Sequence, residues 1–116
     1  MVMSLWQQSR WPAVERELER VVERLRPLDP EKVILFGSFA RGDFHEGSDI
    51  DLMIILDTNE RFIERIGHVL AAVDPVDFDI EPHVYTPVEY SDLKRRRALL
   101  VDAAEREGKV LYERRP

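Results

Sequence analysis

The residues whose types and spacing could perform chemistry lie in one segment, LFGSFARGDFHEGSDIDL, at positions 35–52. Gly37 and Ser38 follow an apolar run, so the chain must turn sharply there and expose backbone N–H groups. A turn of this kind suits an anion such as a phosphate, and the serine adds a hydroxyl donor. After ten further residues, Asp49 and Asp51 flank a single isoleucine. The segment therefore predicts a phosphate-binding turn followed by a pair of carboxylates.

The two aspartates predict a metal site. On a β-strand, residues i and i+2 project from the same face, about 6.6 Å apart at the backbone. Carboxylates about 4 Å apart repel by about 4 kcal/mol at an effective dielectric of 20, and a divalent cation removes that repulsion. Because the chain has no cysteine, the ligands would be oxygens, which favour Mg²⁺ or Mn²⁺ over a structural zinc. A Gly-Ser turn alone is usually a helix cap and Asp-x-Asp alone a surface strand, so the combination carries the prediction.

Hydrophobic periodicity predicts the elements that position these residues. Helices are expected over residues 12–26, 60–73 and 87–107, and strands over 32–36, 50–56, 76–85 and 109–112. A brief helical turn is expected after Gly37, and Asp57 or Thr58 is expected to cap the second helix. The alternation predicts an α/β (α+β) fold, with helices flanking a small mixed β-sheet whose strand order the pattern does not determine.

Size and composition limit the function classes. Residues 1–116 are expected to form a single domain, because the length suits one core and 44% of the residues are hydrophobic. The formal charge of −6 disfavours stable binding to duplex nucleic acid. No apolar run approaches the ~20 residues of a membrane span, and the N-terminus does not read as a signal peptide, so we expect a cytoplasmic protein without membrane contact.

The signature in the opening segment resembles a known family. Gly37-Ser38, ten residues and then Asp49-Ile50-Asp51 resemble the GS-x10-DxD signature of the DNA polymerase β nucleotidyltransferase superfamily, and GSFARGDFHEGSDIDL is similar to its minimal nucleotidyltransferase branch. The resemblance implies a polymerase-β-like fold, ATP as nucleotide donor and two Mg²⁺ ions, with Mn²⁺ as a substitute. It also implies that Gly37 and Ser38 hold the triphosphate and that Asp49 and Asp51 bind both ions. We expect Arg41 to contact phosphate or to pair with Asp43 or Asp49.

A third carboxylate, which the family takes from a neighbouring strand, has three candidates. Asp77, Asp79 and Glu81 alternate along one face of the predicted strand 76–85, so spacing alone does not rank them. We predict Asp79, which is central, with Glu81 second because Pro82 could introduce a bulge. The three histidines, at positions 45, 68 and 83, share no metal-ligand spacing and are expected at the surface.

The resemblance also implies a partner. Members of the branch are commonly paired with HEPN-domain proteins in toxin–antitoxin modules, so the implied function is transfer of AMP from ATP to a hydroxyl of a HEPN toxin by an antitoxin bound to it as a hetero-oligomer. Two alternatives remain open: a catalytically silent module that masks the partner, and a nucleotidyltransferase acting on a small molecule of the aminoglycoside type. Trp6, Trp11 and Phe44 are candidates for an exposed interface.

Overall fold

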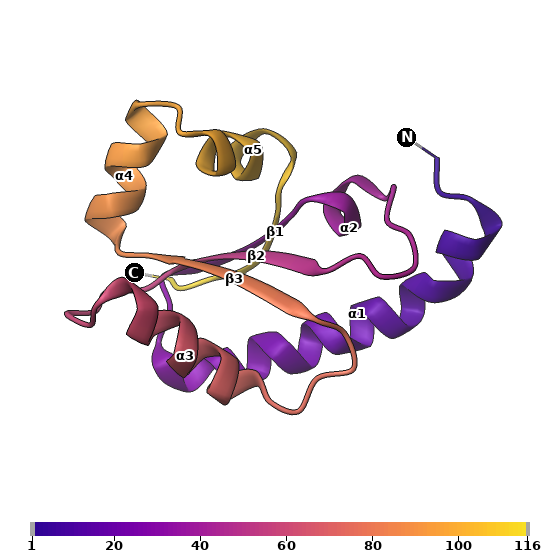
Figure 1. Ribbon diagram of the computed structural model, residues 1–116, viewed down its shortest axis with the longest axis horizontal. Helices are drawn as coiled ribbons and strands as arrows, with labels where there is room; N and C mark the ends of the chain where they lie inside the picture. Colours follow the sequence, from indigo (N-terminus) through magenta and orange to yellow (C-terminus); the bar gives the residue numbers. More distant parts are fainter. Residues whose placement is uncertain (1, 116) are drawn as a thin grey trace.

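Four strands form one mixed β-sheet with helices on both faces in the computed structural model, which describes residues 2–115 (Figure 1). The elements along the chain are α1 (Leu5–Leu25), the 3-10 helix η1 (Arg26–Leu28), β1 (Lys32–Phe36), α2 (Ser38–Arg41), β2 (Ile50–Ile55), α3 (Phe62–Val73), β3 (Ile80–Tyr85), α4 (Pro87–Arg95), α5 (Leu99–Glu107) and β4 (Lys109–Glu113). The predicted α/β class and mixed sheet are confirmed. Among residues 2–115, no helix combines the length and the apolar character needed to span a bilayer.

The strand order is β3-β2-β1-β4. β1 is antiparallel to both β2 and β4, whereas β2 and β3 are parallel and are joined by the crossover helix α3. In the parallel pair, Ile50 is opposite Ile80 and Asp51 is opposite Glu81. This register sets which acidic residue of β3 lies beside the aspartates of β2.

Alternating residues of the central strands build two cores on opposite faces of the sheet. On the face covered by α1 and α3, the buried strand residues are Val33, Leu35, Ile50, Leu52, Ile54 and Val84. On the face covered by α4 and α5 they are Ile34, Phe36, Met53 and Ile55. Figure 1 shows the two helix layers on either side of the sheet. Because Asp51 lies between Ile50 and Leu52, its side chain faces α4 and α5.

Helix α1 begins earlier than predicted. It starts at Leu5 rather than near residue 12, because Ser4 and Gln7 form a capping box in which each side chain accepts a backbone N–H of the other residue. Pro12 therefore lies inside the helix. The Gln7 side-chain amide also donates to the Phe44 carbonyl at 2.7 Å. Phe44 itself is buried, with its ring stacked on Phe39, so its assignment to an exposed interface was wrong.

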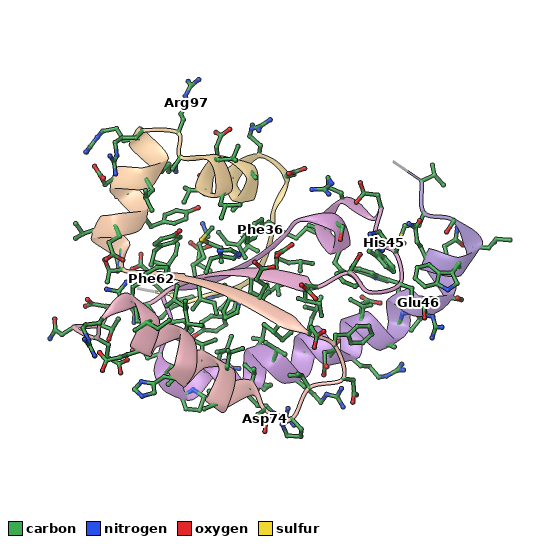
Figure 2. The ribbon with its side chains drawn as sticks, viewed as in Figure 1. Phe36, His45, Glu46, Phe62, Asp74 and Arg97 are labelled. Atoms are coloured by element: carbon green, nitrogen blue, oxygen red, sulfur yellow. The ribbon has the colours of Figure 1, made fainter. Side chains whose placement is uncertain are left out.

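The predicted helix over residues 87–107 is two helices. α4 ends at Arg95, and α5 starts at Leu99 after a turn in which Arg97 adopts a left-handed conformation with φ 54°. The Ala98 N–H donates back to the Leu93 carbonyl at 2.9 Å, which closes the end of α4 without the glycine that usually marks such a turn. Figure 2 shows the Arg97 side chain pointing away from the sheet. The turn folds α5 back across the end of β1.

Two further boundaries differ from the prediction. α3 begins at Phe62 with Arg61 before it, while the Thr58 hydroxyl accepts the Glu60 N–H in the preceding loop. The strand expected over 76–85 pairs with β2 only from Ile80 onward. Residues 76–79 form a loop instead, because the backbone N–H groups of Asp77 and Phe78 are bound by the side chain of Glu17.

Candidate active site

The predicted phosphate turn and one predicted carboxylate meet in a cleft of about 380 Å³ between the sheet and α5. Its floor carries Gly37, Ser38 and Arg41 from the first segment and Asp51, Glu81 and His83 from β2 and β3. The opposite wall consists of Leu100, Ala103 and Glu107 of α5. No sequence pattern predicted this wall, because it depends on the turn that separates α4 from α5.

Glycine is required at position 37 for two reasons. Gly37 has φ 78° and ψ −157°, a backbone region that essentially only glycine adopts. A Cβ built on it would also lie 2.3 Å from Oδ2 of Asp51. Because Gly37 has no side chain, the backbone can turn from β1 into α2 while lying directly against the Asp51 carboxylate. In α2 the Ala40 and Arg41 N–H groups donate to the Gly37 carbonyl at 3.1 and 3.0 Å, so the N–H groups available to an anion are those of Ser38 and Phe39.

We expect Gly37→Ala to abolish nucleotide binding, because the added methyl group must displace either the turn or the Asp51 carboxylate. The matched control is Gly47→Ala. Gly47 also has a positive φ, 88°, but a Cβ there would have nothing within 4 Å. Both variants should lose about 1–2 kcal/mol of stability from the backbone conformation, measured by urea unfolding. Calorimetric titration with ATP and Mg²⁺ should show binding by Gly47→Ala alone; binding by both variants would contradict the steric argument.

Asp51 and Glu81 form a like-charged pair across the parallel strands. They are opposite each other in the register, and the Glu81 carboxylate helps to raise the pKa of Asp51. Burial is the largest cause, followed by Glu81 and then Asp49, of a rise in the pKa of Asp51 from 3.8 to about 6. Without a cation, the folded protein therefore disfavours the ionised form of Asp51.

His83 joins this pair, contrary to the expectation of a surface histidine. Three atoms that could bind a metal, one each from Asp51, Glu81 and His83, lie within 4.8 Å of one another. The His83 side chain is 16% exposed, its ring packs against Phe36 at 5.3 Å between centroids, and burial lowers its pKa. The signal available in the sequence was the i, i+2 spacing of Glu81 and His83, which places both side chains on one face of β3.

The other predicted acidic residues lie outside this group of ligand atoms. Asp49 precedes β2 and is exposed, although its charge contributes to the raised pKa of Asp51. Asp79 precedes β3 and is also exposed; its backbone carbonyl accepts the Ile50 N–H at 2.8 Å. The Asp77 carboxylate pairs with Arg20 of α1 at 2.9 Å. Of the three candidates for the third carboxylate, Glu81 is thus the one that the structure places against Asp51.

Arg41 lies at the mouth of the cleft between two acids. Its Nε is 3.2 Å from Oδ2 of Asp43, and its Nη1 is 3.5 Å from Oε1 of Glu107. The pairing with Asp43, one of the two that we expected, is present. The guanidinium is 40% exposed and lines the same cleft as Ser38, so it can reach a bound anion by exchanging one carboxylate partner for another acceptor.

The cluster has the chemistry of a divalent cation site. Two carboxylates at close range, one with a raised pKa, gain from a positive charge between them, and a histidine nitrogen completes three ligands. Carboxylate oxygens suit Mg²⁺ and Mn²⁺. The bare amides of the turn beside this cluster suit the phosphates that accompany such an ion in nucleotide sites.

Comparison with known proteins relates the chain to one family. The family model of the nucleotidyltransferase domain matches residues 15–111, from the middle of α1 to the middle of β4. Two proteins of Methanocaldococcus jannaschii, both named "putative protein adenylyltransferase", are 52% identical over 33 residues and 58% identical over 26 residues. These segments represent 28% and 22% of this chain. They span 33% and 26% of the length of those relatives.

Two solved structures share the fold. One is described as a putative nucleotidyltransferase from Sulfolobus solfataricus, with a TM-score of 0.57 and 21% identity over 85% of this chain and 82% of the other. The second is described as a toxin–antitoxin with AMP-PNP, with a TM-score of 0.55 and 21% identity over 84% of this chain and 74% of the other. At this level of identity the likeness establishes the fold.

Proposed function

Because this chain belongs to the nucleotidyltransferase domain family, we propose that it transfers AMP from ATP to a hydroxyl group of a partner protein, a HEPN-domain toxin that it neutralises. The observation that carries the proposal is the cleft itself, in which the Gly37-Ser38 turn lies directly against Asp51 and Glu81 lines the same space. Segments resembling protein adenylyltransferases and a fold shared with a toxin–antitoxin structure support a protein acceptor.

The roles of the residues follow from their positions in the cleft. The amides after Gly37 and the Ser38 hydroxyl bind the triphosphate, and Arg41 exchanges a carboxylate for a phosphate oxygen. The acceptor oxygen bonds to the α-phosphorus while the bond to the β-phosphate oxygen breaks and pyrophosphate leaves. Glu81, the most exposed of the three clustered residues, takes the proton of the attacking hydroxyl. This proposal gives Glu81, rather than Asp79, the place of the third carboxylate.

Asp51 and Glu81, with Asp49 beside them, are the residues that would hold two Mg²⁺ or Mn²⁺ ions. Bound there, the ions would neutralise the negative charge shared by the triphosphate and the attacking oxygen. Asp51 can serve this role because Gly37 leaves its carboxylate uncovered and because Met53 and Ile55 fix the strand below it in the core. His83, with its lowered pKa, presents a neutral imidazole to the same space.

The test of the proposed function compares three proteins. The wild type, an Asp49→Asn, Asp51→Asn variant and an Asp57→Asn variant are incubated with a purified HEPN-domain partner, Mg²⁺ and ATP labelled at the α-phosphate. Asp57 is the matched control, since it is an exposed aspartate just beyond the opposite end of β2. We expect labelled partner with the wild type and Asp57→Asn and none with the double variant.

Neutralisation of the toxin in cells separates catalysis from masking. If the double variant still restores growth as well as the wild type does, the chain acts as a binding module, and the proposed transfer is wrong. Label that persists undiminished in the double variant would also contradict it. Label transferred to an aminoglycoside added to the same incubation, without labelled protein, would indicate a small-molecule acceptor instead.

A further inference from the structure

Glu17 is a buried carboxylate that the proposed chemistry does not use. It lies on α1, outside the cleft, with no solvent exposure. Among residues 2–115 the only other buried charged side chain is Arg65. Removing a carboxylate from water is costly unless hydrogen bonds and an opposite charge compensate it. The contacts of Glu17 therefore show what its burial achieves.

Those contacts go to the loop between α3 and β3, which starts at Asp74 (Figure 2). Oε2 of Glu17 accepts the backbone N–H groups of both Asp77 and Phe78, the latter at 2.9 Å. Oε1 accepts a hydrogen bond from Nη2 of Arg20 at 2.6 Å. The same nitrogen of Arg20 is 2.9 Å from the Asp77 carboxylate. Glu17 and Arg20 thus hold this loop at its backbone and at its side chain.

The α1 helix holds the start of the loop as well. Nη1 of Arg24 donates to the carbonyl of Val73 at 2.9 Å and to that of Pro75 at 2.5 Å. Glu17, Arg20 and Arg24 are separated by three and four residues, so they lie along one side of the helix. The loop that leads into β3 is therefore fixed against a rigid element at several points.

The end of the loop connects to both halves of the cleft. The Asp79 carbonyl accepts the Ile50 N–H at 2.8 Å, which sets the register that places Glu81 opposite Asp51. The Phe78 ring meets Phe39 edge-on at 6.1 Å between centroids, and Phe39 belongs to α2, directly after Ser38. The end of the loop thus contacts both the segment that carries the Gly37-Ser38 turn and the strands that carry Asp51 and Glu81.

We propose that Glu17 is a positioning residue for the nucleotidyl-transfer site: by binding the N–H groups of Asp77 and Phe78, it sets where β3 begins and so places Glu81 against Asp51. The inference rests on the proposed function for its kinetic consequence but not for its geometry. Without the Glu17 carboxylate, the two partly buried N–H groups lose their shared partner, and the loop must rotate or admit water. Glu81 then moves relative to Asp51, because β3 continues directly from the loop.

The experiment measures Mn²⁺ affinity in the absence of nucleotide, followed by the kinetics of transfer. Glu17→Gln keeps the side-chain shape but replaces one carboxylate oxygen by an NH2 donor, so the one remaining oxygen cannot accept from both N–H groups and from Arg20 as the carboxylate does. We expect its Mn²⁺ affinity, measured by the signal of free Mn²⁺ in electron paramagnetic resonance, to fall about tenfold, as for other residues that orient metal ligands. We also expect kcat to fall by more than the KM for ATP changes.

Arg65→Lys is the control for a purely structural effect. Arg65 joins α3 to α4 through two bonds to Glu89 at 2.6 and 3.2 Å, near the other end of β3. It should lower the melting temperature and leave Mn²⁺ affinity and kcat unchanged. If Glu17→Gln does not fold, Arg20→Gln, which changes a half-exposed side chain, should weaken Mn²⁺ binding in the same direction.

The outcomes separate this inference from the proposed function. Wild-type affinity and kcat in a destabilised but folded Glu17→Gln variant would overturn the inference, and so would equal losses in Glu17→Gln and Arg65→Lys. Weaker Mn²⁺ binding by Glu17→Gln, combined with a wild type that binds Mn²⁺ but transfers no nucleotide, would contradict the proposed function and support the positioning role.

Discussion

Asp51→Asn is expected to abolish nucleotidyl transfer and, at the same time, to raise the melting temperature of the metal-free protein at pH 7.5. The physical reason is the raised pKa of Asp51, about 6, caused first by burial and then by Glu81 and Asp49. An ionised carboxylate that the folded state disfavours subtracts from stability, and asparagine has the same shape without the charge. A gain of 1 kcal/mol would raise the melting temperature of a domain of this size by about 4 °C.

The sign of the pH dependence follows from the direction of that shift. The folded pKa exceeds the unfolded value, so the contribution of Asp51 to stability is complete below about pH 4 and is lost as the pH rises through 6. The difference in melting temperature between Asp51→Asn and the wild type should therefore be largest above pH 7 and should vanish near pH 4. Thermal unfolding of the two metal-free proteins across this range measures it.

Added Mn²⁺ provides the complementary measurement. It should raise the melting temperature of the wild type at pH 7.5 and have little effect on Asp51→Asn, because ligand binding to the folded state alone stabilises it. Asp57→Asn, an exposed position beyond β2, should behave as the wild type in every assay. If Asp51→Asn were less stable than the wild type at pH 7.5 in the absence of metal, the ionised Asp51 carboxylate would not destabilise the folded protein, and this prediction would be wrong.

The second large effect concerns the third carboxylate. Glu81→Gln is expected to lower kcat by about 100-fold or more, the usual scale for loss of a group that moves a proton in the transition state. Asp79→Asn, two residues earlier, should retain transfer. Both changes remove one charge from an exposed side chain and keep its shape, so the pair isolates position from charge.

The comparison decides between two registers of the same strand. Asp79 was the prediction from the sequence, whereas the structure places Glu81 opposite Asp51. Steady-state kinetics of the two variants, with Asp77→Asn as a third, would settle the choice. If Asp79→Asn were the inactive one, the strand would have to be shifted by two residues in the active complex, and the role assigned to Glu81 would be wrong.

The motif of Gly37-Ser38 followed by Asp49 and Asp51 could be recognised in the sequence, because it depends on residues close together in the chain. The apolar run before Gly37 and Ser38 and the alternation around Asp51 are properties of a few neighbouring residues, although Asp49, which was predicted on the same strand face, precedes β2. The amphipathic patterns of α1 and α3 and the apolar runs of β1 and β2 were equally local. The bounds of α3, β1 and β2 and the end of α1 were therefore found within a few residues, whereas α1 starts well before the predicted position.

Other features depended on contacts between distant segments. Asp77, Asp79 and Glu81 have the same pattern in the sequence, and Glu17, sixty residues before Asp77, determines where β3 begins. The division between α4 and α5 has no glycine or proline to mark it, yet it creates one wall of the cleft.

The sequence alone thus indicated that the Gly37-Ser38 turn and Asp51 of the next strand belong to one cleft, since both are set by backbone geometry over a few residues. Metal binding by Asp49 and Asp51 stays a prediction. The tertiary structure alone decided which further side chains join them. Register and helix placement arise from burial and hydrogen bonds between segments far apart in the chain, and no local pattern records these. Glu81 and His83 face Asp51 because a buried carboxylate on α1 holds the loop that leads to them.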